Sequence, residues 1–140
     1  MDGKMNKLDV VLKNSLEELQ RATGEIDAFL EQIGASGETV FNVHFVVEEM
    51  LSNVIKYAFK DSSQHEILLE ITSEKKDLRI VIEDDGMEFN PLSVPEKKTD
   101  LPLQEREIGG LGIHLVRKIA RDMTYLRRNG RNRLEMSLLI

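Results

Sequence analysis

A carboxylate and an amide stand one helical turn apart in the segment Val40–Phe59, where Glu49 precedes Asn53 by four residues. Phe45 and Tyr57 extend the same row by one turn in each direction. Residues at this spacing lie on one face of a helix. Both polar groups can form strong hydrogen bonds, so they could act together on a neighbouring group or ligand. They could equally form a surface pair that stabilises the helix by roughly 0.2–0.5 kcal/mol.

An apolar stripe beside this row predicts a helix over Val40–Phe59. The residues of the stripe recur at helical spacing and are Val40, Val43, Val47, Met50, Leu51, Val54 and Ala58. We expect this stripe to face the core, so that Glu49 and Asn53 lie beside the buried face.

An acidic turn, Asp84-Asp85-Gly86, follows a strand-like run. Such turns are common because Asp tolerates turn backbone and Gly accepts a positive φ.

A glycine cluster, Gly109-Gly110-Leu111-Gly112, opens a helix later in the chain. Exposed backbone N–H groups at a helix N-terminus form an anion site, although a tight turn would also explain the cluster. No Gly-Lys-Ser/Thr follows, as a Walker phosphate-binding loop would require, and Leu115 stands where a dinucleotide-binding fingerprint requires its last glycine. The pattern therefore argues against both of those nucleotide-binding loops.

The composition indicates one globular domain. The 140 residues are 41% hydrophobic and 31% charged, contain no cysteine and carry a net charge of −6. This charge argues against direct nucleic-acid binding. The lack of a long charge-free apolar run or an apolar signal core argues against a membrane span and a secretory leader. We expect a cytoplasmic protein whose partners are proteins or small molecules.

The remaining patterns predict a fold of the α+β class, with a mixed, mostly antiparallel sheet covered by about three helices in a two-layer sandwich. The predicted elements are a strand at Leu8–Lys13, helices at Ser15–Ile33 and Val40–Phe59, strands at Glu66–Thr72 and Leu78–Glu83, a loop at Pro91–Ile108, a helix from the glycine cluster to Ala120, and a hairpin of Met123–Arg127 with Arg133–Ile140. Its turn is Asn129-Gly130.

Taken together and in this order, the motifs resemble those of the Bergerat-fold (GHKL) ATP-binding domain. Glu49-Met-Leu-Ser-Asn53 is similar to its first motif, Asp84-Asp-Gly86 to its second and Gly110-Leu-Gly112 to its third. The resemblance covers the chain from about Val40 to the last strand. Within the superfamily, the small size and the continuations of these motifs look most like anti-sigma-factor serine-protein kinases of the stress-response and sporulation type.

The resemblance implies a role for each motif. Asn53 would hold Mg²⁺ through its amide oxygen, and Glu49 would act as the general base on the attacking hydroxyl. Asp84 would accept a hydrogen bond from the adenine amino group of ATP, and Gly86 would let the backbone approach the base. The phosphate-binding helix start would consist of Gly109, Gly110, Leu111 and Gly112.

The resemblance also makes the whole chain, 1–140, a single histidine-kinase-like ATP-binding domain with an ATP lid at 91–108. Lys97, Lys98 and Arg106 would neutralise phosphate charge from the lid, or they could be solvated loop charges.

Two positions depart from the family pattern. Tyr57 stands where these kinases often have histidine, and Met87-Glu88 replaces a glycine-containing turn.

Two sets of residues lie outside the motifs. The histidines are on separate elements without metal-ligand spacing: His44, His65 and His114. The last hairpin is basic, and its arginines could form a solvated edge or a docking patch: Arg127, Arg128, Arg131 and Arg133.

The function implied by the resemblance is phosphorylation of a serine on a STAS-type antagonist protein, with a sigma factor as the other partner and a homodimer as the assembly. The alternative is an ATP-binding regulatory module without catalytic turnover. A detached histidine-kinase catalytic domain is a third possibility, although the chain lacks the helix pair that carries the phospho-accepting histidine.

Overall fold

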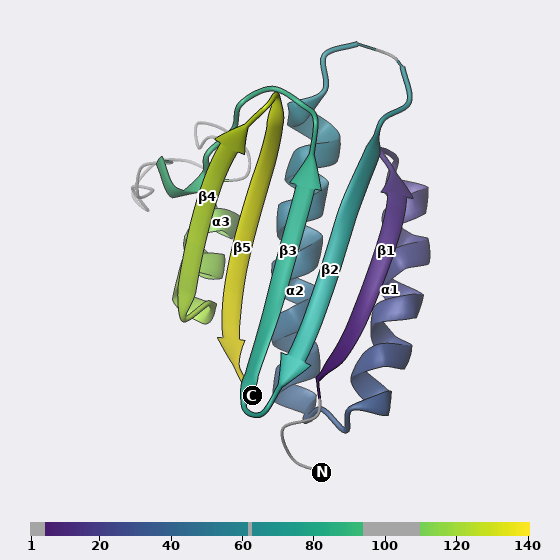
Figure 1. The fold of residues 1–140 in the computed structure, drawn as a ribbon, viewed down its shortest axis with the longest axis vertical. Helices are drawn as coiled ribbons and strands as arrows, with labels where there is room; N and C mark the ends of the chain where they lie inside the picture. The colour runs from purple at the N-terminus through teal and green to yellow at the C-terminus, as the bar shows by residue number, and fades with distance from the viewer. Residues whose placement is uncertain (1–4, 62, 94–109) are drawn as a thin grey trace.

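The protein folds as an antiparallel sheet with helices on one face (Figure 1). The structure is a computed structural model and describes residues 5–61, 63–93 and 110–140. The elements are β1 (Asn6–Lys13), α1 (Leu16–Gln32), α2 (Gly37–Asn53), the π-helical turn η1 (Val54–Ala58), β2 (Glu66–Glu74), β3 (Asp77–Asp84), the 3₁₀ turn η2 (Pro91–Ser93), α3 (Gly110–Ile119), β4 (Asp122–Arg128) and β5 (Arg131–Leu139).

In the described part of the chain, five strands lie in the order β1-β2-β3-β5-β4, and all four pairings between them are antiparallel. The last hairpin therefore docks through its second strand, which places β5 beside β3. In that register Asp84 lies opposite Asn132, at the end of β3 from which the chain leaves the sheet. Both predicted hairpins are present, and Lys75, Asn129 and Gly130 adopt the positive φ values of 57°, 54° and 74° that their tight turns require.

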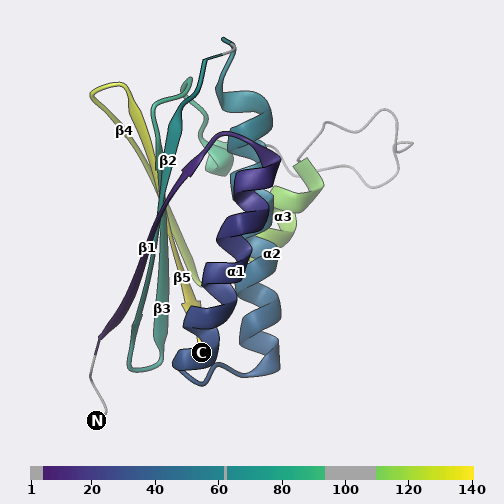
Figure 2. The same ribbon diagram turned by 90° about the vertical axis from the view of Figure 1, so that its right-hand side faces the viewer.

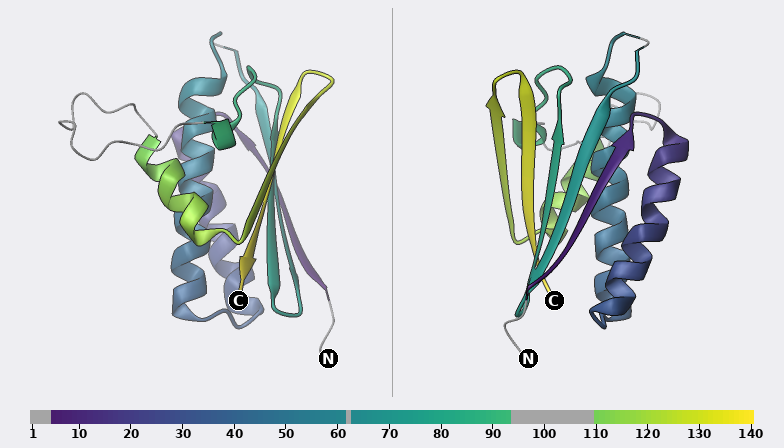
Figure 3. Two further views of the ribbon diagram at one scale, coloured as in Figure 1. Left: turned by 90° about the vertical axis from the view of Figure 1, so that its left-hand side faces the viewer. Right: turned by 45° about the vertical axis from the view of Figure 1, so that its right-hand side comes forward.

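Strand periodicity separates the two faces of the sheet. Alternate residues of β2, such as Ile67, Leu69 and Ile71, are buried against the helices, while those between them point outward. Figure 2 shows the sheet edge-on, with α1, α2 and α3 together on one side. The two further views in Figure 3 agree, and in the described ranges no helix covers the other face. The predicted two-layer α+β sandwich is thus confirmed.

The first predicted helix is also confirmed. The Ser15 hydroxyl caps α1 by accepting a hydrogen bond from the Glu18 N–H at 3.2 Å, which satisfies one of the free N–H groups at the helix start. The buried residues of α1, including Ala22, Ile26 and Leu30, form the stripe that packs on the sheet. No helix in the described ranges is long and apolar enough to cross a membrane.

The prediction that α2 stays α-helical to Phe59 is wrong. The α-helix begins at Gly37, ends at Asn53 and continues as a π-helical turn over Val54–Ala58. The wider turn sets Ala58 against Gly86, because the Ala58 carbonyl accepts a hydrogen bond from the Met87 N–H at 2.8 Å. Single π-helical turns of this kind often occur at functional sites, and this one directly follows Asn53.

Candidate functional site

The first motif and the start of α3 meet where α2 packs beside α3 (Figure 2). Gly112 lies so close to Glu49 that a Cβ atom added at this glycine would be 2.0 Å from Glu49 Oε2. The carboxylate therefore occupies the space that any side chain at position 112 would need. Two residues that are 63 positions apart are thus brought into direct contact, at the end of α3 where free N–H groups gather.

Asn53 lies one turn beyond Glu49 and is 5% exposed. Its Nδ2 donates a hydrogen bond to the Glu49 carbonyl oxygen at 2.8 Å, so Oδ1 is the atom of the amide that can bind a ligand. Amide oxygens suit hard cations such as Mg²⁺. In the described ranges no three His, Cys, Asp or Glu side chains form a metal-binding group, so a cation at Asn53 would need further ligands from a bound phosphate or water.

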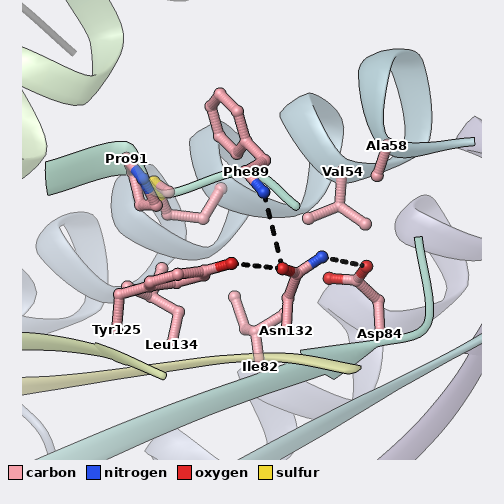
Figure 4. A pocket seen from close by; sticks show the side chains of 10 residues that line it. Val54, Ala58, Ile82, Asp84, Phe89, Pro91, Tyr125, Asn132 and Leu134 are labelled. Carbon is pink, nitrogen blue, oxygen red and sulfur yellow. Dashed lines mark hydrogen bonds between the residues drawn. The ribbon is translucent and has the colours of Figure 1, made fainter. Parts of the chain in front are cut away.

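Asp84 lies at one end of a second part of the site, a mostly apolar pocket between α2 and the sheet (Figure 4). The pocket is lined by Met50, Val54, Ala58, Ile82, Asp84, Phe89, Pro91, Tyr125, Asn132 and Leu134. Its cavity is about 20 Å³, room for roughly one water molecule. A larger ligand would therefore displace one of the lining side chains.

The Asp84 carboxylate is buried, with 3% of the residue exposed. Its Oδ1 accepts hydrogen bonds from the Gly86 N–H at 2.8 Å and from Asn132 Nδ2 at 3.0 Å. Burial raises the pKa of Asp84 above its usual value, and these two hydrogen bonds oppose the increase. A carboxylate oxygen beside apolar walls suits a flat heteroaromatic ring that carries an amino group.

Asn132 joins the segments around this pocket and was not predicted from the sequence. Its Nδ2 donates to Asp84 Oδ1 and to the Met87 carbonyl at 2.7 Å, and its Oδ1 accepts from the Tyr125 hydroxyl at 2.5 Å, Arg127 Nη1 at 3.1 Å and the Phe89 N–H at 3.4 Å. Three of these contacts are visible in Figure 4, where Asn132 lies between Tyr125 and Asp84. One amide therefore fixes both the carboxylate and the chain that follows it.

Gly86 is needed for a close approach between chains. A Cβ atom there would lie 2.6 Å from Ala58 Cβ and 2.7 Å from the Ala58 carbonyl oxygen. Arg127 Nη1 donates to the Gly86 carbonyl at 2.7 Å. The turn therefore holds its shape although Met87-Glu88 replaces the glycine-containing turn of the family pattern, because Asn132 and Ala58 bind the Met87 backbone.

The basic hairpin divides between two environments. Arg127 donates hydrogen bonds to the Gly86 carbonyl and to Asn132 Oδ1 beside the pocket, so the interpretation of this residue as a solvated edge or a docking charge is wrong. Arg133 lies on the uncovered face of the sheet, where Nη1 is 3.0 Å from Glu83 Oε2. The difference follows from strand alternation, since neighbouring residues point to opposite faces. The sequence did not reveal it because the pairing of the hairpin with β3 was unknown.

His65 and its contacts connect the segment after η1 to the acidic turn. His65 Nε2 lies 2.8 Å from Asp61 Oδ1, and Nδ1 lies 3.1 Å from Asp85 Oδ1. The Phe59 ring stacks on the imidazole with centroids 4.4 Å apart. The two carboxylates raise the pKa of His65, mainly through the hydrogen bond with Asp61, while this same bond lowers the pKa of Asp61. Sequence reasoning gave His65 no role because its contact with Asp85, 20 positions later, forms only in the folded chain.

The folded protein should lose stability as pH rises through the pKa of His65. A raised folded-state pKa means that the charged ring stabilises the fold fully below the unfolded value of about 6.5 and ceases to do so above the folded value. Asp61, with its lowered pKa, contributes above its unfolded value of about 3.8. We expect His65→Gln to lower the melting temperature more at pH 6 than at pH 8.5, as measured by circular dichroism. Asp61→Asn should reduce the same pH dependence, whereas an equal loss at both pH values would contradict this account.

The other predicted site residues fall into two groups. Gly110 and Leu111 form the first turn of α3, as predicted. The four remaining residues lie outside the described ranges: Lys97, Lys98, Arg106 and Gly109. The same holds for most of the predicted lid, of which Pro91–Ser93 form η2. Tyr57, the departure in the first motif, is exposed on η1.

Comparison with known proteins relates this chain to a described family. Residues 12–138 match the family described as the histidine kinase-like ATPase domain. The serine/threonine-protein kinase BtrW of Bordetella bronchiseptica is 26% identical over 130 residues, which cover 89% of this chain and 92% of that protein. The anti-sigma F factor of Clostridium novyi is 26% identical over 87 residues, covering 62% of this chain and 59% of that protein.

A solved structure supports the fold. The crystal structure of the RsbU and RsbW domains of a Mycobacterium tuberculosis protein superimposes with a TM-score of 0.66 at 14% identity. The match covers 96% of this chain and 32% of the solved one, so the chain described above spans about a third of that protein.

Proposed function

Because this chain belongs to the histidine kinase-like ATPase domain family, we propose that it is an ATP-dependent serine-protein kinase that acts as an anti-sigma factor. It transfers the γ-phosphoryl group of ATP to a serine on a STAS-type antagonist protein and binds a sigma factor. The observation that carries the proposal is the contact between Glu49 and Gly112. It supports the proposal because a carboxylate, the group that a general base requires, lies beside a helix start that would bind phosphate oxygens.

The nucleotide would lie across both parts of the site. Its adenine ring would enter the pocket of Figure 4, and the adenine amino group would donate a hydrogen bond to Asp84. Its phosphates would reach the N-terminus of α3 at Gly110 and Gly112. Lys97, Lys98, Arg106 and Gly109 are proposed to contact the phosphates, on the family resemblance alone.

Asn53 would hold Mg²⁺ through Oδ1, and the ion would neutralise phosphate charge. The residues fit this role because the hydrogen bond to the Glu49 carbonyl fixes the orientation of the amide. Glu49 would then take the proton of the serine hydroxyl as its oxygen attacks the γ-phosphorus, while the bond from that phosphorus to the β,γ-bridging oxygen breaks and ADP leaves.

The names of the relatives support the proposed partners. One relative is called an anti-sigma F factor and another a serine/threonine-protein kinase. We propose that the chain forms a homodimer, acts in the cytoplasm and regulates transcription through the sigma factor.

The test is a transfer assay with radiolabelled ATP, Mg²⁺ and purified STAS-domain proteins from the same genome. The proposal requires label on one of these proteins and its loss when the acceptor serine is replaced by alanine. A chain that binds ATP but labels none of them would be a regulatory module instead.

Gly112→Ala should reduce phosphotransfer while the fold stays intact. The new Cβ needs the space of the Glu49 carboxylate, and a flexible carboxylate end can swing away at little cost. The displaced group can no longer meet the serine hydroxyl, so we expect kcat to fall about 100-fold, the lower range for loss of acid–base catalysis.

The matched control for Gly112→Ala is Gly24→Ala in α1, where an added Cβ meets nothing within 4 Å. This control should keep full activity and gain about 0.5–1 kcal/mol of stability, because alanine favours helix. Wild-type kcat in Gly112→Ala would disprove the idea that the Glu49 position matters.

A further inference from the structure

We infer that two stacked phenylalanines on α2, Phe41 and Phe45, form the docking surface for the protein substrate. Phe41 is 66% exposed, the highest value among the large apolar side chains that the structure describes. Its ring stacks on Phe45, with centroids 6.4 Å apart and planes 14° from parallel. Phe45 packs in turn against the core. This inference rests on the proposed kinase function and specifies where its substrate binds.

A single exposed apolar residue is ordinary on a protein surface. Here the exposed ring is held in place by a second ring, so little conformational entropy would be lost when a partner covers it. Large rigid aromatic side chains of this kind dominate the binding energy of many protein interfaces.

The position of the pair identifies its occupant. Phe41, Phe45 and Glu49 follow one another at four-residue spacing along the same helix. With a rise of 1.5 Å per residue, Phe45 stands about 6 Å and Phe41 about 12 Å from Glu49 along the helix axis. A protein that brings a serine hydroxyl to the Glu49 carboxylate therefore lies within reach of both rings.

The other sides of α2 contact the rest of the protein, so the row of Phe41 and Phe45 is the side that a partner can cover. The opposite face of α2, including Val43, Val47 and Met50, is buried in the core. On the flank towards α1, His44 Nε2 lies 2.5 Å from Asp27 Oδ1 and so ties the two helices together. Gly112 of α3 lies against the carboxylate of Glu49. The substrate thus approaches over Phe41 and Phe45, and it carries an exposed apolar side chain about 6–12 Å from its acceptor serine.

The test measures binding and transfer separately for Phe41→Ala. The probe is each purified STAS-domain protein of the same genome, titrated into the chain with a non-hydrolysable ATP analogue and Mg²⁺ in a calorimeter. We expect the Kd for the protein, and its KM in the transfer assay, to rise about tenfold, as for a typical interface anchor. The affinity for the ATP analogue and the kcat at saturating substrate should stay unchanged. Leu139→Ala, at a side chain that is 65% exposed, is the matched control and should change neither constant.

Each other outcome is decisive. Equal Kd values for wild type, Phe41→Ala and Leu139→Ala would overturn the inference, as would failure of every STAS-domain protein to bind wild type. A change in the association state of the chain itself on Phe41→Ala, measured by sedimentation, would make the occupant a second copy and also overturn it. Binding that is weakened by Phe41→Ala, without any transfer by wild type, would support the surface while refuting the kinase proposal.

Discussion

Glu49→Gln is expected to lower phosphotransfer to the antagonist serine by a factor of about 10² to 10⁴, the usual contribution of a positioned general base. The amide cannot take the proton of the serine hydroxyl, although it fills nearly the same space above Gly112. ATP affinity should change little, because the adenine pocket and Asn53 are intact. Single-turnover transfer and calorimetric ATP binding would be measured on the same preparation.

Glu48→Gln is the matched control for the Glu49 variant. Glu48 is the neighbouring residue, but its Oε2 lies 3.6 Å from Nδ1 of His44, the α2 residue that contacts Asp27 of α1. The Glu48→Gln variant should transfer phosphate at the wild-type rate. Full transfer by Glu49→Gln would remove this residue as the base, and equal losses in both variants would point to a general effect of charge.

Asp84→Asn is expected to weaken ATP binding by a factor of roughly 10 to 150, corresponding to the roughly 1.5–3 kcal/mol of a hydrogen bond to a charged group. The amide oxygen can still accept from the Gly86 N–H and from Asn132, which occupy Oδ1 in the wild type. The amide nitrogen then faces the amino group of adenine, so two donors meet.

The stability of Asp84→Asn separates this role from a structural one. The raised pKa shows that the fold disfavours the ionised carboxylate, so stability should be lost as pH rises through the range between the unfolded and folded pKa values. The neutral amide removes this cost, and the melting temperature at pH 7.5 should be equal or higher. A variant that loses ATP binding because it unfolds would contradict the prediction.

Nucleotide preference provides the control for the Asp84 variant. Inosine triphosphate lacks the amino group, so wild type should bind ATP more tightly, and Asp84→Asn should lose this preference. Asp85→Asn, at the exposed neighbouring position, should keep it. An unchanged preference in Asp84→Asn would mean that the base is recognised elsewhere.

The sequence determined the parts of this protein whose geometry is local. Helical spacing put Glu49 and Asn53 on one row, and residue types at single turns identified the Asn129-Gly130 hairpin and the Asp84–Gly86 turn. The α-helical limit of α2 was missed because η1 depends on a contact with a distant turn: Ala58 accepts its hydrogen bond from Met87.

Only the tertiary structure decided which distant residues complete the site. Asn132 donates a hydrogen bond to Asp84, which lies 48 positions earlier in the chain. The two residues meet because β5, and not β4, pairs with β3. Nothing in the alternation of either strand specifies this choice, since residues of both strands alternate between a more exposed and a less exposed face. The same docking turns Arg127 towards Gly86, and the packing of α3 on α2 brings Gly112 to Glu49. The chain thus encodes its chemical groups locally, while the order of the strands and the packing of the helices bring them together.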